Sequence, residues 1–144
     1  MFKPVKIERL GLDITTDQVV VILREIDGSR SLPIWIGNLE ASAIAVAMEG
    51  VEPPRPITHD LLKSILDTMG AAVDRIEIND LRNETFYALI HLRVDGRRYE
   101  IDSRPSDALA LALRTKSPIL VADSVLQRAG VEANDEEQKG DQIG

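Results

Sequence analysis

The 144-residue chain lacks cysteine, contains only two histidines and is poor in aromatic residues, which make up 3% of it. Without cysteine the chain has neither disulfide bonds nor thiolate metal ligands, which leaves His59 and His91 as its imidazole ligands. The sequence also has no apolar run near the roughly 20 residues of a membrane-spanning helix and no signal peptide at its start. We therefore expect a cytoplasmic protein that has no membrane segment and no organic cofactor.

Positive charge is scarce as well. The formal net charge is -7, and residues 131–144 hold five acidic residues against one lysine. A chain this acidic does not attract nucleic acid by its overall charge, so any such contact must be local, at arginines or at a bound metal. Residues 131–144 have no apolar periodicity, which predicts a single domain over residues 1–130 followed by an acidic, disordered tail.

Strands and helices are expected in groups rather than in strict alternation. Turn signals and β-branched runs predict strands at 5–14, 18–26, 29–37, 72–80, 85–94, 97–102 and 118–123. Helices are predicted at 38–50 with Asn38 as cap, at 58–70 with Thr58 as cap, after Pro105, and at 124–130. This order favours an α+β fold, a mostly antiparallel or mixed sheet with about four helices packed on it. The first helix is apolar nearly all round and is expected to be buried, and Trp35 is expected in the core.

Three acidic residues surround the start of the helix in the stretch EIDSRPSDALALALR, residues 100–114. A tight turn at Asp95-Gly96 fixes the strand register, so Glu100 and Asp102 point to one face, and Pro105 keeps Asp107 close to them. Carboxylates that converge in this way repel one another unless a cation lies among them. The cation is either Mg²⁺ or Mn²⁺, held by these three carboxylates, or the side chains of Arg98, Arg104 and His91 in a salt-bridge network.

Two helix starts share one pattern. PRPITHDLL and SRPSDALAL each place an Arg-Pro pair before a hydroxyl residue and an aspartate, namely Arg55, Thr58 and Asp60, and Arg104, Ser106 and Asp107. An arginine beside free backbone amides is suited to hold a phosphate or carboxylate. We expect both starts to line one site. Asp60 and Asp107 are each either part of that site or an acidic residue that stabilises its helix start through the helix dipole. His59 is either a polar residue of a first helical turn or a general acid or base, and Glu40 is either a dipole-stabilising acid or a pocket carboxylate.

The blocks LPIWIGNLEASAIAVAMEG, PRPITHDLLKSIL, TFYALIHL and IDSRPSDALALALR, in this order and spacing, resemble the bifunctional nuclease family. The resemblance covers roughly residues 5–129. It implies an α+β fold that tends to oligomerise and the hydrolysis of RNA and DNA, an activity reported for plant members. The positions that match the family's blocks are Glu40, Arg55, Pro56, Thr58, His59, Asp60, Asp102, Arg104, Pro105, Ser106 and Asp107.

Two hypotheses follow for the function. The first is a metal-dependent phosphodiesterase in which Asp102 and Asp107, with Glu100 or Asp60, hold Mg²⁺ or Mn²⁺ while arginines orient the phosphate. In that enzyme Arg55 and Arg104 bind phosphate and His59 transfers protons. The second is a non-catalytic regulatory or scaffolding oligomer that binds a small anion or a protein partner. The family resemblance favours the first, whereas net acidity and few aromatic residues favour the second. In both cases we expect a homo-oligomer, because two apolar helices and the edge strand with Pro33 leave apolar surface to cover.

Overall fold

The computed structural model describes residues 1–132 and shows one eight-stranded sheet with four helices. Along the chain the elements are β1 (Phe2–Asp13), β2 (Gln18–Glu25), β3 (Arg30–Ile36), α1 (Asn38–Met48), α2 (Thr58–Thr68), β4 (Ala71–Arg82), β5 (Thr85–Val94), β6 (Arg97–Ser103), α3 (Pro105–Thr115), β7 (Ile119–Ala122), α4 (Asp123–Ala129) and β8 (Val131–Glu132). The strand order is β6-β5-β4-β7-β1-β2-β3-β8. Only β4 and β7 pair in parallel, so the predicted α+β fold with a mixed sheet is confirmed.

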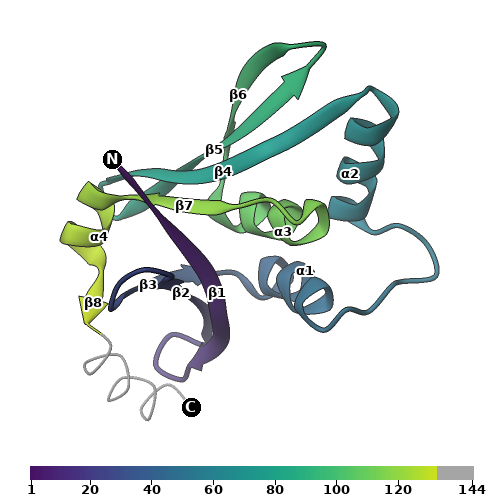
Figure 1. Ribbon diagram of the computed structural model, residues 1–144. Coiled ribbons are helices and arrows are strands. Elements are labelled where there is room, and N and C mark those ends of the chain that lie inside the picture. Colours follow the sequence, from purple (N-terminus) through teal and green to yellow (C-terminus); the bar gives the residue numbers. More distant parts are fainter. Residues whose placement is uncertain (133–144) are drawn as a thin grey trace.

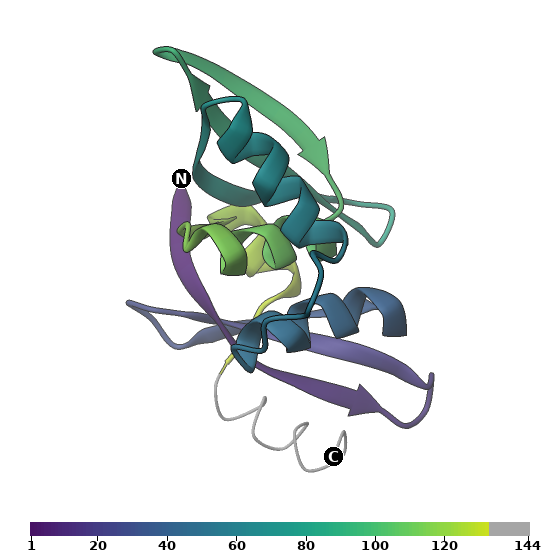
Figure 2. The same ribbon diagram turned by 90° about the vertical axis from the view of Figure 1, so that its right-hand side faces the viewer.

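The short strand β7 joins two antiparallel halves of the sheet. One edge of β7 pairs with the start of β1, and the other pairs with β4. Figure 1 shows β4, β5 and β6 on one side of β7 and β1, β2 and β3 on the other. Figure 2 shows α2, α3 and α1 stacked in this order, so α3 lies between the other two helices and contacts both. The start of α3 is therefore bordered by elements that are distant in sequence.

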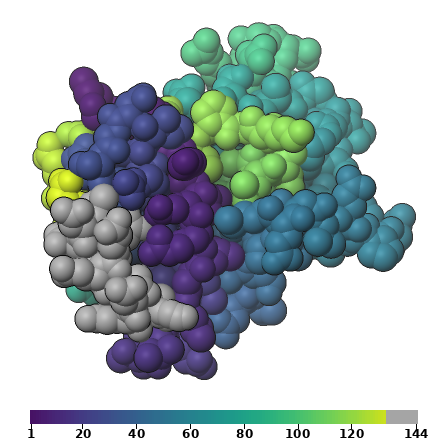
Figure 3. Space-filling model, turned by 60° about the horizontal axis from the view of Figure 1, so that its bottom comes forward, coloured from purple at the N-terminus to yellow at the C-terminus, as the bar shows by residue number. Residues whose placement is uncertain are grey.

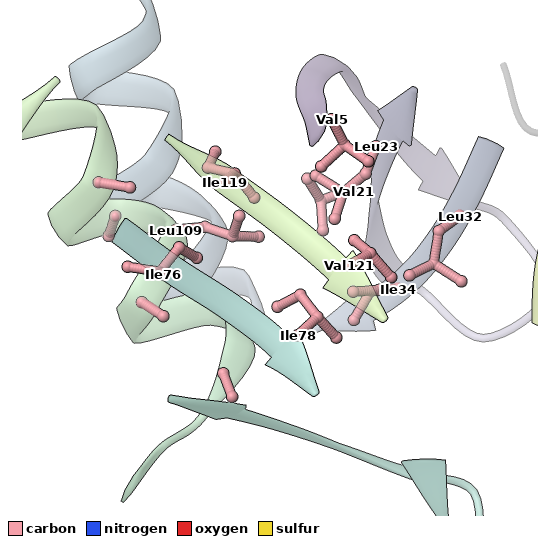
Figure 4. Close-up of a cluster of buried hydrophobic side chains, with 14 of the residues drawn as sticks. Val5, Val21, Leu23, Leu32, Ile34, Ile76, Ile78, Leu109, Ile119 and Val121 are labelled. Atoms are coloured by element: carbon pink, nitrogen blue, oxygen red, sulfur yellow. The ribbon is translucent and has the colours of Figure 1, made fainter. Parts of the chain in front are cut away.

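The core forms where α3 meets the central strands. In Figure 4 the side chains of Val5, Val21, Ile34, Ile78 and Val121 converge from β1, β2, β3, β4 and β7, with Leu109 of α3 beside them. Seven of the eleven residues of α3 are buried, including Leu109 and Leu111. This burial confirms that the alanine- and leucine-rich helix after Pro105 is interior. The start of an interior helix is a place where polar side chains need partners.

The Asp95-Gly96 turn has the predicted effect on the β5–β6 hairpin. Both residues have positive φ, 51° and 78°, as a type I′ turn requires. The predicted register is confirmed: Val94 faces Arg97, and Leu89 faces Asp102. This register places Asp102 next to the start of α3.

Two burial predictions are wrong. The first helix is not buried all round, because only Ala41 and Ile44 of α1 are buried and Leu39 is 85% exposed. Its packing on α3 and β2 covers one face only. Trp35 is 46% exposed rather than in the core. Side chains alternate along β3, and the buried neighbours Ile34 and Ile36 take the core face, which leaves Trp35 on the other.

The predicted helix caps also differ from the structure. Asn38 and Thr58 are the first helical residues, and Gly37 and Ile57 occupy the cap positions without a side-chain cap. In α2 the carboxylate of Asp60 takes over part of this task, since its Oδ2 accepts a hydrogen bond from the Ile57 amide at 3.1 Å. The start of α2 is therefore stabilised by Asp60, which agrees with the alternative in which this residue serves its own helix start.

The predicted tail begins with an ordered strand. Val131 and Glu132 form β8, which pairs with Ser31 and Arg30 of β3, and the Ser29 hydroxyl donates to Glu132 Oε2 at 2.7 Å. The strand β8 thus extends two residues beyond the predicted domain boundary at residue 130. The rest of the predicted tail, residues 133–144, lies outside the described residues. Among residues 1–132, no helix is long and apolar enough to cross a membrane.

Candidate functional site at two helix starts

The structure brings the two Arg-Pro helix starts together within one chain. His59, in the first turn of α2, lies with its Nε2 2.9 Å from Oδ1 of Asp107 in the first turn of α3. Arg104, the cap residue of α3, donates from Nε to Asp107 Oδ2 at 2.9 Å and from Nη2 to Asp107 Oδ1 at 3.2 Å. The two starts therefore share Asp107 as a common acceptor.

Arg104 also reaches the start of α1. Its Nη1 donates to Glu40 Oε2 at 3.3 Å, so two carboxylates hold one guanidinium. The Arg104 side chain is nevertheless 63% exposed, against 25% for Glu40 and 33% for Asp107. Glu40 folds back over Gly37, where a Cβ would collide with Glu40 Oε1, so this arrangement needs glycine at position 37. Arg104 is thus a fixed cation that faces solvent.

The charge state of Asp107 follows from its partners. Burial tends to raise the pKa of this carboxyl, but the hydrogen bonds from Arg104 and His59 outweigh it and leave the pKa below its usual range. The same contact with Asp107 raises the pKa of Arg104. Asp107 is therefore a carboxylate at neutral pH, and its negative charge holds Arg104 in place.

His59 is buried, and one of its two ring nitrogens is paired with Asp107. Its side chain is 11% exposed, its Nε2 is occupied by Asp107, and its Nδ1 is buried with no hydrogen-bond partner in the described part of the chain. A general acid or base must reach the atom whose proton it transfers. The contact with Asp107 suits a residue that orients this carboxylate, and the expected role of His59 in proton transfer stays a prediction.

Two adjoining hollows share Arg104. A groove of about 950 Å³ lies between α2 and the β5–β6 hairpin, where Thr58, His59, Asp102, Arg104 and Asp107 line it together with apolar side chains of α2, β5 and β6. A smaller pocket of about 350 Å³ is lined by Arg104, Glu40 and Ser106, and by Trp35 and Phe86. Most of the predicted site residues therefore lie around one exposed guanidinium.

Three predicted residues lie elsewhere. Asp60 accepts a hydrogen bond from Arg114 Nε at 2.7 Å, on a different side of α2 from His59. Arg55 is exposed in the linker that projects between α1 and α2, seen at the right of Figures 1 and 3. Glu100 is exposed on β6, where it faces His91, whose Nε2 contacts Glu77 instead.

The predicted carboxylate trio does not fit a divalent ion as arranged. Within residues 1–132, no group of three or more His, Asp or Glu side chains is placed to hold a metal ion, so Glu100, Asp102 and Asp107 are not assembled. Both oxygens of Asp107 already accept hydrogen bonds from Arg104 or His59. Of the cationic side chains considered for this stretch, Arg104 pairs with Asp107, whereas His91 pairs with Glu77.

Sequence analysis missed Arg114, Trp35 and Phe86 as parts of these surfaces. Arg114 follows Asp107 by seven residues, two turns of helix, so both lie on the face of α3 that meets α2. That spacing could have indicated Arg114 as a contact of α2. In the structure His59 contacts Asp107, and Asp60 contacts Arg114. Trp35 and Phe86 gave no comparable signal, since both stand in apolar strands.

Comparison with known proteins identifies the family. The model of the bifunctional nuclease domain matches residues 21–134, which include every candidate site residue named above. The chain belongs to the bifunctional nuclease domain family. The resemblance carried by the four sequence blocks is thereby confirmed.

Relatives of this bifunctional nuclease domain occur in bacteria and plants. The uncharacterized protein Rv1829 of Mycobacterium tuberculosis is 42% identical over 132 residues, which cover 92% of this chain and 79% of that protein. Bifunctional nuclease 2 of rice is 33% identical over 118 residues, 79% of this chain but 36% of the plant protein. Bifunctional nuclease 1 of Arabidopsis thaliana is 31% identical over 105 residues, 70% of this chain and 32% of that protein. The chain thus spans about a third of the plant nucleases.

Proposed function

We propose that this bifunctional nuclease domain holds a nucleic acid strand at Arg104 and hydrolyses its phosphodiester bonds. The observation that carries the proposal is an exposed guanidinium fixed by two carboxylates. Of the five N–H groups of Arg104, three are used by Asp107 and Glu40, and the remaining two are free to donate to phosphate oxygens. A guanidinium held in place in advance stabilises the charge that develops on a phosphate during cleavage.

The pocket beside Arg104 supports a nucleic acid ligand. Trp35 is 46% exposed and lines this pocket with Phe86, which supplies aromatic surface on which a base could stack. The Ser106 hydroxyl lies in the same pocket. Two of the five aromatic side chains of the chain thus line the pocket beside the candidate phosphate site, so the small number of aromatic residues does not argue against a nucleic acid ligand.

Glu40 is the group we assign to proton transfer. Hydrolysis requires a base to take a proton from water as the water oxygen bonds to phosphorus, and the bond to the leaving oxygen then breaks as that oxygen takes a proton from solvent. Glu40 lies next to Arg104 with its side chain 25% exposed. Asp107 is less suited to this task, because its oxygens are engaged and its lowered pKa makes it a weak base. No step of this scheme passes through a metal ion.

A second candidate function is binding without hydrolysis, by a regulatory or scaffolding module. The hydrogen bonds of Asp107 favour it, because a carboxylate with both oxygens paired is a feature of a structural network. The two functions share Arg104 and differ in whether Glu40 transfers a proton.

Cleavage and binding of labelled single-stranded RNA and DNA oligonucleotides test the proposal. Arg104→Ala should weaken binding about tenfold or more, since a hydrogen bond to a charged group contributes roughly 1.5–3 kcal/mol. Glu40→Gln should keep the binding affinity but slow cleavage by about 100-fold or more. Each assay is run with Mg²⁺, with Mn²⁺ and with chelator, which also tests the metal dependence expected from the sequence.

Arg97→Ala is the matched control. It removes an exposed arginine at the far end of β6, about 20 Å along the strand from Ser103, and should change neither binding nor cleavage. Cleavage that persists unchanged in Glu40→Gln would remove Glu40 from the mechanism. Binding without any cleavage by the parent chain would favour the second function, and absence of binding would defeat both.

The expected homo-oligomer stays a prediction, and α2 offers a surface for it. Leu61, Ile65 and Met69 repeat every four residues and are 53%, 51% and 70% exposed. We expect light scattering at micromolar concentration to show an oligomer that Ile65→Glu converts to monomer, because a charge is costly to bury in an apolar contact. The control Leu39→Glu, at an exposed position on α1, should leave the mass unchanged. A strictly monomeric parent chain would contradict the prediction.

A further inference from the structure

A third hollow lies on the other side of the start of α2. It has a volume of about 600 Å³ and is bordered by the end of α1, the linker between α1 and α2, the first turns of α2 and the end of α3. Its charged lining consists of Lys63, Arg114 and Lys116 against Glu52 and Asp60. Pockets of this size commonly hold small organic ligands. Neither Arg104 nor Asp107 belongs to its lining, so it is distinct from the proposed nuclease site.

Arg114 carries an unmet hydrogen-bonding requirement in this hollow. Its side chain is only 7% exposed. The Nε atom donates to Asp60 Oδ1 at 2.7 Å and Nη1 donates to the Ala110 carbonyl at 2.8 Å. Nη2 is buried and has no partner among the described residues. Buried donors of a charged group are normally paired, so an unpaired one on the wall of a pocket points to a missing acceptor.

The carboxylates of the pocket do not supply that acceptor. Asp60 accepts from Arg114 Nε and from the Ile57 amide, and the hydrogen bond from Arg114 is the main reason that the pKa of Asp60 is lowered. Glu52 is exposed in the linker. Lys63 donates to Asp67 at 2.6 Å. Neither carboxylate of the lining therefore pairs with Arg114 Nη2.

Lys116 provides a second cation from an unusual backbone position. It ends α3 with φ of 56°, in the left-handed region, and the Ser117 amide donates to the Ala112 carbonyl at 3.0 Å to close the helix. Glycine is the usual residue at this position, because a side chain there is strained. Lys116 is exposed and makes no ion pair within residues 1–132, so its ammonium group is available to a ligand.

We propose that this hollow binds a phosphate monoester whose phosphate accepts from Arg114 Nη2 and from the Lys116 ammonium. The apolar part of the lining, which includes Val51, Pro53 and Leu113, would contact the organic body of the ligand. Arg114 is paired with Asp60 and Lys63 with Asp67, so Lys116 and the unpaired Nη2 of Arg114 are the donors that remain for a phosphate in this lining. The linker at residues 49–57 has neither helix nor strand and loops outward in Figure 1, so a ligand can enter beside it without moving a helix.

Isothermal titration calorimetry of the full chain with adenosine monophosphate and with inorganic phosphate tests the proposal. We expect adenosine monophosphate to bind, and inorganic phosphate, which lacks the organic body, to bind more weakly. Lys116→Gly should weaken binding about tenfold or more by removing one charged donor. It should not lower the melting temperature, because glycine is favoured at this φ. Arg114→Lys should also weaken binding, because it keeps a charge but loses the donor at Nη2.

Lys6→Gln is the control, since it removes an exposed ammonium group from β1 and should leave the affinity unchanged. The proposal is overturned if the parent chain binds neither probe at millimolar concentration, or if Lys116→Gly binds as tightly as the parent. It is also overturned if Arg104→Ala abolishes binding while Lys116→Gly does not, because the probe then occupies the nuclease site. Loss of binding in Lys116→Gly with cleavage retained would support this pocket independently of the proposed nuclease activity.

Discussion

Asp60→Ala is expected to lower the free energy of unfolding by about 3 kcal/mol, a large effect for one polar side chain. Arg114 is 93% buried, its side chain being 7% exposed, and Asp60 is the only carboxylate bonded to it within residues 1–132. Removing one partner of a buried ion pair leaves the other charge without compensation, which is the costly case. The substitution also removes the acceptor of the Ile57 amide at the start of α2.

Urea unfolding of a double-mutant cycle measures this effect. Asp60→Ala combined with Arg114→Met should be more stable than Asp60→Ala alone, because the buried methionine carries no charge that needs a partner. Asp67→Ala is the control on the same helix, since its pair with Lys63 is exposed and should contribute under about 1 kcal/mol. A cost for Asp60→Ala as small as that of the control would show that Arg114 gains water or another acceptor.

The pH dependence of the same variants provides a second measurement. Arg114 lowers the pKa of Asp60 in the folded chain, so the folded state binds a proton less readily than the unfolded state. The contribution of Asp60 to stability is therefore fully present above the unfolded pKa of about 4 and is lost as the pH falls through the lower folded pKa. The stability difference between the parent chain and Asp60→Asn should shrink below pH of about 4. A difference that grows on acidification would contradict this sign.

The parts of the structure that sequence predicted correctly rest on local signals. Asp95-Gly96 requires two positive φ values, and that requirement fixed the register of a whole hairpin. Pro105 begins a helix, and the alanine and leucine run after it is interior. The repeated Arg-Pro pattern predicted that the two helix starts would lie together, and His59 contacts Asp107, although Arg55 and Asp60 of the pattern lie elsewhere.

What sequence could not predict depends on which competing partner wins in three dimensions. Both Arg-Pro starts carry an aspartate at a matching position, yet Asp107 pairs with Arg104 while Asp60 pairs with Arg114. The choice of partners follows from the way α2 packs against α3. His59 and Asp60, which are adjacent in α2, contact Asp107 and Arg114, which are seven residues apart in α3. The burial of Trp35 was predicted wrongly for a similar reason. Side chains alternate between the two faces of β3, and this alternation alone does not show which face lies on the core.

Asp107→Ala is expected both to disable the proposed nuclease site and to destabilise the fold. The carboxylate accepts hydrogen bonds from Arg104 Nε and Nη2 and contacts His59 Nε2. Without it Nε2 of the largely buried His59 loses its partner, and Nδ1 is already buried and unpaired, so the loss costs roughly 1–3 kcal/mol. Arg104 then keeps only Glu40 as a partner, so its position beside the two hollows is less defined. Urea unfolding should show the loss of stability, and oligonucleotide binding should weaken about tenfold.

Asp102→Ala is the informative comparison for this substitution. Asp102 is exposed in the same groove, and its carboxylate has no hydrogen bond or ion pair within the described residues. Removing the carboxylate should therefore change stability by under about 0.5 kcal/mol. If the site acts through Arg104, Asp102→Ala also retains most of the cleavage activity. If instead Asp102→Ala abolishes cleavage that depends on Mg²⁺ or Mn²⁺ while Asp107→Ala preserves it, Asp102 acts as a metal ligand and Asp107 does not. Arg104 would then be secondary, because the network that holds it could be removed without loss of the chemistry.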